Sequence, residues 1–132
     1  MNQMNQMIYE GTVASIGDME TLPSGTTVLT LSICNSREYR KSDGTKETER
    51  NYIETKAFGK SAEVIKRFAR EEDPVRVVGR LKQERWTNSN GKIQSRIVIV
   101  GEHFELPELG KRRNQAEPEK AAQKVENDGM EL

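Results

Sequence analysis

The sequence contains few of the residues on which enzyme chemistry depends. It has one cysteine, Cys34, and one histidine, His103. A single cysteine excludes an internal disulfide and favours a reducing compartment. The sequence has no zinc-ligand spacing, Walker loop or Gly-rich dinucleotide turn. We therefore expect no enzyme activity, no metal and no cofactor.

Aromatic residues, net charge and long apolar runs are scarce as well. Aromatics make up 5% of the 132 residues, so the position of each one is informative. The 21 basic residues balance the 21 acidic ones, so a nucleic-acid partner would have to be recognised by where the charges point. No stretch approaches the ~20 apolar residues that span a bilayer, and residues 1–7 do not form a secretory signal. We expect a cytoplasmic protein with no membrane contact.

The remaining pattern predicts five strands and one helix. Alternation and β-branched residues indicate strands over 8–16, 26–35, 51–58, 75–86 and 92–106. Gly17-Asp18 is predicted to end the first strand, and the charged stretch 36–50, with Asp43-Gly44 at its centre, to form a long hairpin loop. Ser61 is predicted to cap a helix that ends at Arg70. Gly79 is predicted to mark a bend or a bulge in the fourth strand.

Three strands, one helix and two further strands give the layout of the OB-fold, a five-stranded Greek-key barrel. The chain is therefore predicted to be all-β, with one helix between strands 3 and 4. The helix face of Val64, Ile65 and Phe68 would plug one end of the barrel. The predicted domain covers 8–106, after a flexible N-terminal extension over 1–7 and before a disordered polar tail over 107–132. Within that tail, Pro118–Val125 could form a transient helix.

The third and fourth strands each combine an apolar row with an outer row of aromatic and basic side chains. Period two places Tyr52, Glu54, Lys56 and Phe58 on one face of the third strand. In the fourth strand it separates Val75, Val77 and Leu81, assigned to the core, from an outer row of Arg76, Val78, Arg80, Lys82, Glu84 and Trp86.

Flat rings and cations in one row suit an unpaired nucleic-acid strand. Aromatic rings stack on bases of any sequence for ~1–3 kcal/mol each, a value established for OB-fold proteins that bind single strands. Lys and Arg between the rings neutralise phosphates and release counterions. Cross-strand packing is the more common role of a single strand aromatic, and a core position is equally expected for Phe58. Burial of Trp86, Tyr52 and Phe58 inside the barrel would contradict this interpretation.

Four segments resemble bacterial single-stranded DNA-binding proteins: Leu22–Gly25, Ala57–Glu63, Val78–Leu81 and Arg85–Gly91. The resemblance covers about residues 8–106. It implies sequence-nonspecific binding and protection of single-stranded DNA in replication, recombination and repair. It also implies a homotetramer, with the first strand region, around Ile8–Glu10, as the dimer edge.

The predicted DNA-binding set combines the residues that the resemblance implies with the basic residues of the outer rows and of the charged loop. Its members are Tyr39, Tyr52, Phe58, Trp86, Arg37, Arg40, Lys41, Lys56, Lys60, Arg76, Arg80, Lys82 and Arg85.

The sequence also departs from the family pattern. Tyr52 stands where the family usually has Trp, and Glu54 would place a negative charge on the DNA face. The tail ends in Glu126–Leu132 instead of an Asp run with a Pro-Phe tip. Its acidic residues and final Leu imitate only weakly the tip with which the family recruits replication and repair proteins. Two alternatives stay open: a diverged paralogue that binds DNA without recruiting partners, and an OB domain that mediates protein–protein interaction without nucleic acid, which the zero net charge favours.

Overall fold

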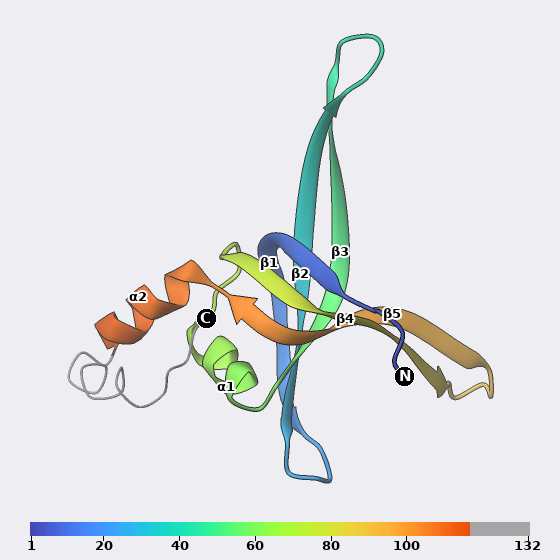
Figure 1. Cartoon of the computed structure of the whole chain (residues 1–132), viewed down its shortest axis with the longest axis vertical. Coiled ribbons are helices and arrows are strands. Elements are labelled where there is room, and N and C mark those ends of the chain that lie inside the picture. The colour runs from blue at the N-terminus through green and yellow to red at the C-terminus, as the bar shows by residue number, and fades with distance from the viewer. Residues whose placement is uncertain (117–132) are drawn as a thin grey trace.

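The computed structural model describes residues 1–116. In chain order the elements are β1 (Met7–Thr21), β2 (Thr27–Arg40), β3 (Lys46–Phe58), α1 (Gly59–Phe68), β4 (Pro74–Thr87), β5 (Ile93–Glu105) and α2 (Pro107–Ala116). The strands close a barrel in the spatial order β1-β2-β3-β5-β4 (Figure 1). All neighbours are antiparallel except β3 and β5, which are parallel. The predicted OB-fold, with a helix between β3 and β4, is confirmed.

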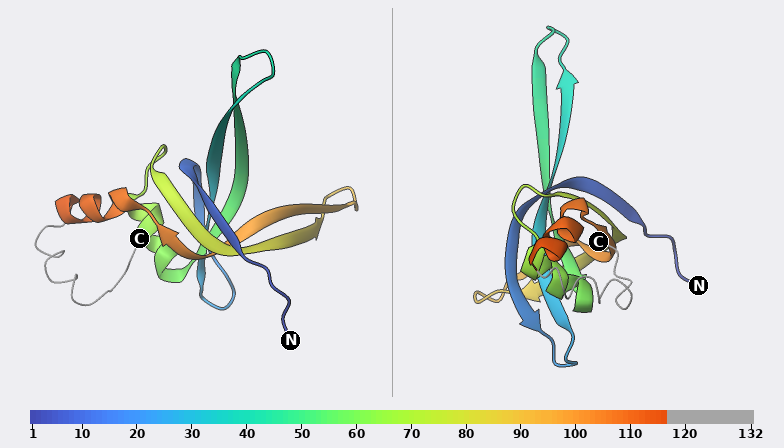
Figure 2. Two further views of the ribbon diagram at one scale, coloured as in Figure 1. Left: turned by 45° about the horizontal axis from the view of Figure 1, so that its top comes forward. Right: turned by 90° about the vertical axis from the view of Figure 1, so that its left-hand side faces the viewer.

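Three hairpins project from the barrel in different directions, as the views in Figures 1 and 2 show. The β2–β3 hairpin is the longest, and the β1–β2 hairpin extends the opposite way. The β4–β5 hairpin points away from the two helices, which lie together at the other end of the barrel. The described helices are too short and too polar to cross a bilayer.

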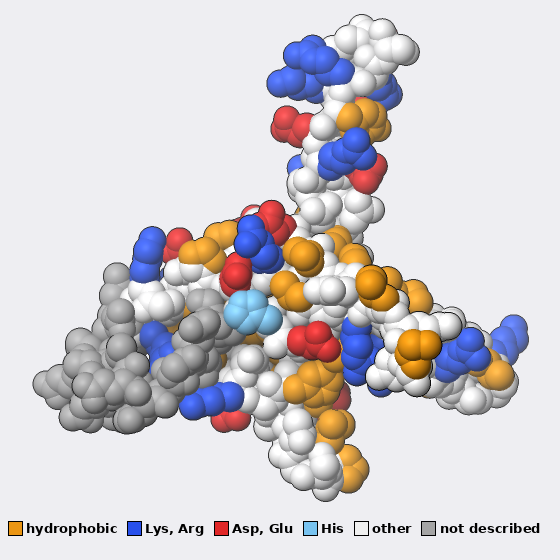
Figure 3. All heavy atoms as spheres, viewed as in Figure 1, with side chains coloured by type: hydrophobic (Ala, Val, Ile, Leu, Met, Phe, Trp, Pro, Cys, Tyr) orange, Lys and Arg blue, Asp and Glu red, His pale blue; other side chains and the backbone are white. Residues whose placement is uncertain are grey.

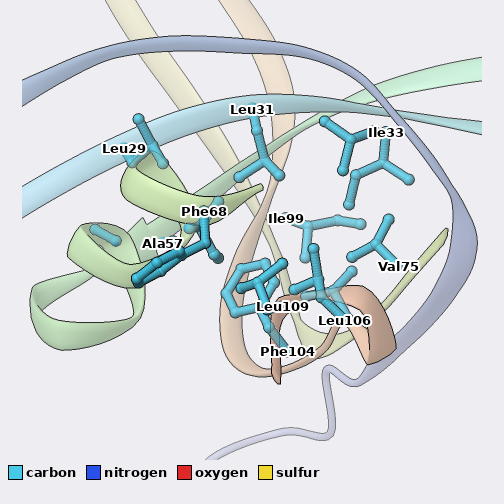
Figure 4. Packing of buried hydrophobic residues seen from close by; sticks show 14 residues of the cluster. Leu29, Leu31, Ile33, Ala57, Phe68, Val75, Ile99, Phe104, Leu106 and Leu109 are labelled. Atoms are coloured by element: carbon cyan, nitrogen blue, oxygen red, sulfur yellow. The ribbon is translucent and has the colours of Figure 1, made fainter. Parts of the chain in front are cut away.

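The core is formed by the inward rows of the strands and one face of α1 (Figure 4). Leu31 of β2 and Ile99 of β5 are buried within the barrel, and Ile65 and Phe68 of α1 are buried against the same cluster. This confirms that α1 plugs the barrel. Burial of these apolar side chains is the main force that holds the helix there.

Leu81 is not the core residue that the alternation predicted. It lies on the same face of β4 as the buried Val77, but it is 37% exposed. The reason is that the pairing of β4 with β1 ends at Gly79, so that beyond this residue the β4–β5 hairpin extends past the closed part of the barrel formed by the described residues. Alternation predicts the face of a side chain correctly here but not its burial.

The helix begins earlier than predicted. Ser61 does not cap it, because α1 starts at Gly59 with Phe58 in the N-cap position and no side-chain capping bond. Gly59 has a φ of +59°, a left-handed conformation that glycine adopts without steric cost. The chain can therefore turn directly from β3 into α1.

Two stretches that the sequence predicts to lie between strands are mostly paired strand in the structure. β1 continues past Gly17-Asp18 through a register irregularity between Ile16 and Met19. The stretch 36–50 is mostly paired: β2 and β3 remain in register from Asn35↔Asn51 to Arg40↔Lys46, which leaves a turn over 41–45. Backbone pairing in a two-stranded ribbon does not require apolar side chains, so the charged composition was misleading.

The bulge predicted at Gly79 is confirmed, but the extra residue belongs to β5. Val78 pairs with His103 and Gly79 with Gly101, so Glu102 has no partner in β4. The alternation of β4 therefore continues unchanged, and its outer row is the one predicted. A Cβ on Gly79 would lie 2.0 Å from the carbonyl oxygen of Val100, so this close approach requires glycine.

Both predicted domain ends differ from the structure. Residues 107–116 form α2, with Leu109 buried in the core, so the disordered tail predicted from 107 is wrong for this stretch. At the other end, Asn5 donates to and accepts from the backbone of Leu81, which attaches part of the predicted flexible extension to β4. The predicted helix over 118–125 and the tail tip lie outside the described residues.

Candidate nucleic-acid interface

The pairing registers bring the predicted outer rows together on one face of the barrel, because directly paired residues point to the same side of a sheet. In the antiparallel β4–β5 hairpin, Glu84 pairs with Arg96 and Trp86 with Gln94. In the parallel β3–β5 ladder, Glu54 pairs with Val98. Tyr52, Lys56 and Phe58 follow on β3, and Lys82 on β4. We call this surface the stacking face, defined by Tyr52, Glu54, Lys56, Phe58, Lys82, Glu84, Trp86 and Arg96.

The aromatic residues of the stacking face are open to solvent. Tyr52 is 62% exposed and Trp86 is 45% exposed, while Phe58 is half-buried at the end of β3. None of the three is sealed inside the barrel, so the arrangement that would have contradicted the interpretation is not found. A base stacks on one accessible face of a ring, and the exposed side chain of Tyr52 offers such a surface.

Tyr52 has a thiol as its neighbour across the ladder. Cys34 of β2 pairs directly with Tyr52, and the neighbouring thiol raises the pKa of the tyrosine above its ordinary value. Tyr52 is therefore a neutral phenol near pH 7 and does not add negative charge to the face.

Tyr39 does not join these aromatics. It lies two residues from the hairpin turn and pairs with Glu47, which places it on the opposite face of the β2–β3 ribbon from Tyr52. Its hydroxyl donates to Glu47 Oε2 at 2.9 Å. A strand on the stacking face would reach Tyr39 only by crossing the edge of the ribbon.

The predicted cations of the β2–β3 hairpin are largely satisfied locally. Lys41 Nζ lies 2.6 Å from Glu47, Arg40 donates to the Gly44 carbonyl at 3.2 Å, and Arg37 pairs across the ladder with Glu49. Basic and acidic side chains lie side by side along this hairpin in Figure 3. It is therefore a ribbon of mixed charge and not a basic arm.

Arg76 is far from Trp86, although both belong to the same row. The ten steps that separate them along β4 correspond to roughly 33 Å. Arg76 forms ion pairs with Glu10 at 2.5 Å and with Glu105 at 3.1 Å. Arg80, four residues further along, lies 3.9 Å from Glu102. The structure thus places Arg76 at the β1 side of the barrel, away from the stacking face.

Lys82 is the most available cation of the stacking face, because it has no acidic partner among residues 1–116. Lys56, by contrast, lies 2.6 Å from Glu84. Arg85 projects to the other face of the hairpin, where it donates to Gln83 at 3.3 Å, and Lys60 lies in the first turn of α1.

Arg96 is the residue of this face that sequence reasoning missed. Its guanidinium carbon lies 5.4 Å from the centroid of the Trp86 ring, within the range of a cation–π interaction. It also forms ion pairs with Glu84 and Glu54. The sequence carried a signal for it: the tight turn at Asn88–Gly91 sets the hairpin register, and that register places Arg96 opposite Glu84.

The described residues contain no group of three or more His, Cys, Asp or Glu side chains that could hold a metal ion. His103 lies 3.6 Å from Glu105 on the outer surface of β5. Together, the closed five-stranded barrel, the helix between β3 and β4, and one open face of rings and charges define an OB domain with a surface for stacking ligands.

Comparison with known proteins identifies the family. The model of the single-strand binding protein family matches residues 4–107, and the chain belongs to this family. It is 31% identical over 102 residues to the single-stranded DNA-binding protein of Helicobacter hepaticus, which covers 77% of this chain and 60% of that protein. It is 30% identical over 126 residues to the single-stranded DNA-binding protein of Aquifex aeolicus. This match covers 95% of this chain and 85% of the Aquifex protein.

Solved structures share the fold. The Plasmodium falciparum SSB in complex with ssDNA superposes with a TM-score of 0.69 at 18% identity, over 80% of this chain and 95% of that chain. A deletion mutant of the single-stranded DNA binding protein from Thermus aquaticus gives a TM-score of 0.67 at 22% identity. The superposition covers 78% of this chain and 50% of the Thermus chain. The chain spans 57–63% of the length of its curated relatives from Helicobacter and Wolinella.

Proposed function

We propose that this protein binds and protects single-stranded DNA, without sequence preference, in replication, recombination and repair. The observation that supports this most is the exposure of Tyr52 and Trp86 on one face of a closed barrel, with Lys82 on the same face. Stacking of bases on these rings tolerates any sequence, because every base has a π-face. Membership of the single-strand binding protein family and the names of its relatives support the same conclusion.

The decisive experiment is a titration of the protein with oligo-dT at two salt concentrations, followed by the fluorescence of Trp86, the single tryptophan. We expect quenching, and a lower affinity at the higher salt concentration because phosphate contacts release counterions. No quenching and no salt sensitivity would instead favour an OB domain that mediates protein–protein interaction.

We propose that the protein assembles as a homotetramer through the first strand region. Residues Met7–Thr12 pair with β4 along one edge, while pairing with β2 begins only at Thr12. Among the described residues no strand is paired with the other edge of β1 before Thr12, although the Asn35 side chain donates to the Glu10 carbonyl there at 2.8 Å. An unpaired edge is a template for pairing with another copy. Sedimentation velocity at micromolar concentration tests this, and a monomer would contradict it.

The proposal includes recruitment of replication and repair proteins through the region after α2. A pull-down with the full chain and with a chain that ends at residue 116 tests it, and equal capture by both would contradict it. We further propose a cytoplasmic protein without catalytic activity, in keeping with its membership of the single-strand binding protein family.

A further inference from the structure

Four charged side chains form a continuous network on the stacking face. Lys56 Nζ lies 2.6 Å from Glu84 Oε2, Arg96 Nε donates to Glu84 Oε1 at 3.2 Å, and Arg96 Nη1 lies 2.9 Å from Glu54 Oε2. We call Lys56, Glu84, Arg96 and Glu54 the ion-pair quartet. Two cations and two carboxylates sum to no net charge. A phosphate therefore meets no net attraction from the quartet unless one of its pairs opens.

Glu84 is the central member of the quartet, since it contacts both cations. Its side chain is only 17% exposed. Val98 lies on the same outer face by register and is nevertheless fully buried, which places it beneath these long side chains. A carboxylate at such a site is stable in its charged form only when it is paired. The hydrogen bond from Lys56 holds the pKa of Glu84 below its ordinary value in spite of the burial, and Arg96 contributes in the same direction.

The same network covers the tryptophan. Arg96 lies over the Trp86 ring, 5.4 Å from its centroid, and its guanidinium forms ion pairs with Glu84 and Glu54 at the same time. A base that stacks on this side of the ring must displace Arg96. Glu84 therefore helps to hold one cation over the stacking surface, and it binds a second cation that would otherwise face the phosphates.

We propose that Glu84 is an internal competitor of DNA phosphates, which sets the affinity of the stacking face by occupying Lys56 and Arg96. DNA binds by opening these pairs, so that phosphates replace the carboxylate. This inference rests on the proposed function and adds to it the residue that limits affinity. It implies that binding releases fewer counterions than the number of basic residues on the face would suggest.

The opposite role makes the opposite prediction. If Glu84 instead positioned Lys56 and Arg96 in the geometry that DNA requires, removal of its charge would weaken binding. The sign of the effect therefore separates competition from positioning.

The test is Glu84→Gln, which keeps the size of the side chain and an acceptor oxygen but removes the charge. Binding of fluorescein-labelled oligo-dT is measured by anisotropy over a series of salt concentrations, with thermal unfolding as the check on folding. We expect binding at least ~3-fold tighter at low salt. The slope of log K against log salt should become steeper by about 0.7 for each cation released to a phosphate.

Two further variants complete the experiment. Glu54→Gln removes one of the two carboxylates on Arg96 and should give a smaller increase in affinity and slope. Glu63→Gln makes the same change in net charge on the exposed surface of α1, and its slope should equal that of the wild type.

The outcomes are distinct. Unchanged or weaker binding by Glu84→Gln, with wild-type binding intact, would overturn the inference. If Glu84→Gln does not fold, Glu54→Gln replaces it in the test, because the Glu54 side chain is more exposed. Unchanged or weaker binding by that variant would then overturn the inference. Absence of binding by the wild type and all variants at low salt would instead contradict the proposed function.

Discussion

Arg112 of α2 binds the carboxylate of Asp73 with both arms of its guanidinium. Nη2 donates to Oδ1 at 2.6 Å, and Nη1 donates to Oδ2 and, at 3.1 Å, to the Phe68 carbonyl at the end of α1. Asp73 also accepts from the backbone N–H of Arg70 at 2.9 Å. One side chain thus fastens α2 to the end of α1 and to the loop that leads into β4.

Arg112→Ala should destabilise the protein. The substitution leaves the Asp73 side chain, which is only 6% exposed, without its charged partner, and a loss on the order of 1–3 kcal/mol follows for an unsatisfied buried acceptor. Urea unfolding measures the change in the free energy of unfolding. Lys111→Ala, at the exposed neighbouring position, is the matched control and should change it little; equal effects of the two variants would show that the ion pair contributes nothing.

Asp73 should also make stability depend on pH in the acidic range. Burial alone would raise the pKa of Asp73, but the hydrogen bonds from Arg112 and from the backbone of Arg70 lower it below its ordinary value. A lowered native pKa gives a stabilisation that is present above the unfolded pKa, about 3.9, and is lost as the pH falls through the native pKa. The stability difference between wild type and Asp73→Asn should therefore be constant above about pH 5 and shrink in more acidic solution. Urea unfolding between pH 2 and pH 7 measures it; a difference that grows on acidification would contradict the assignment.

Trp86→Ala should weaken DNA binding by a similar factor for every base sequence. The loss of one stacking ring corresponds to ~1–3 kcal/mol, or roughly 5–150-fold in affinity. Anisotropy with labelled dT, dA and dC oligonucleotides measures the factor. Leu22→Ala, an exposed apolar residue at the β1–β2 hairpin, should have no effect. A loss confined to one base type would indicate hydrogen-bonded readout instead of stacking.

Lys82→Ala and Lys56→Ala should differ in their effect on the salt dependence. Lys82 has no acidic partner among residues 1–116, so its removal should reduce the slope of log K against log salt by about 0.7. Lys56 is already paired with Glu84 at 2.6 Å, so its removal should change the slope less. Equal reductions would mean that Lys56 releases as many counterions as Lys82 does, so that Glu84 does not occupy it before DNA binds. Lys111→Ala on α2 is the control for net charge.

Gly79→Ala and Gly110→Ala should have opposite effects on stability. A Cβ on Gly79 would lie 2.0 Å from a backbone oxygen of β5, and the required shift of a barrel strand should cost about 1–3 kcal/mol. Gly110 lies in α2, where an added Cβ would meet no atom within 4 Å, and alanine there should stabilise the helix by up to ~1 kcal/mol. Thermal unfolding of both variants provides the comparison. If Gly79→Ala left the thermal stability unchanged, β4 and β5 would be able to separate at the bulge without loss of stability.

Much of the site was predictable because it depends on local alternation. The row of Tyr52, Lys56 and Phe58 and the row that ends in Trp86 follow from period two, and the structure leaves both rows intact. Arg96 was predictable in principle from the hairpin turn before it. The pairing of Lys56 with Glu84 was not, because it joins β3 to β4 through the parallel β3–β5 ladder, and no local pattern sets the register of that ladder.

The sequence by itself determined the order of the five strands and α1, the five-stranded fold and the faces of its strands, since turn residues and alternating side chains act over a few neighbours. Tertiary structure decided where the domain ends, how far the hairpins extend, and which charges are available. Leu109 and Arg112 lie in a polar stretch whose helix is stabilised by contacts with α1 and Asp73. Likewise, the charge that the stacking face offers to DNA depends on which carboxylates the barrel places beside Lys56 and Arg96, because an ion pair between distant segments exists only after the chain has closed.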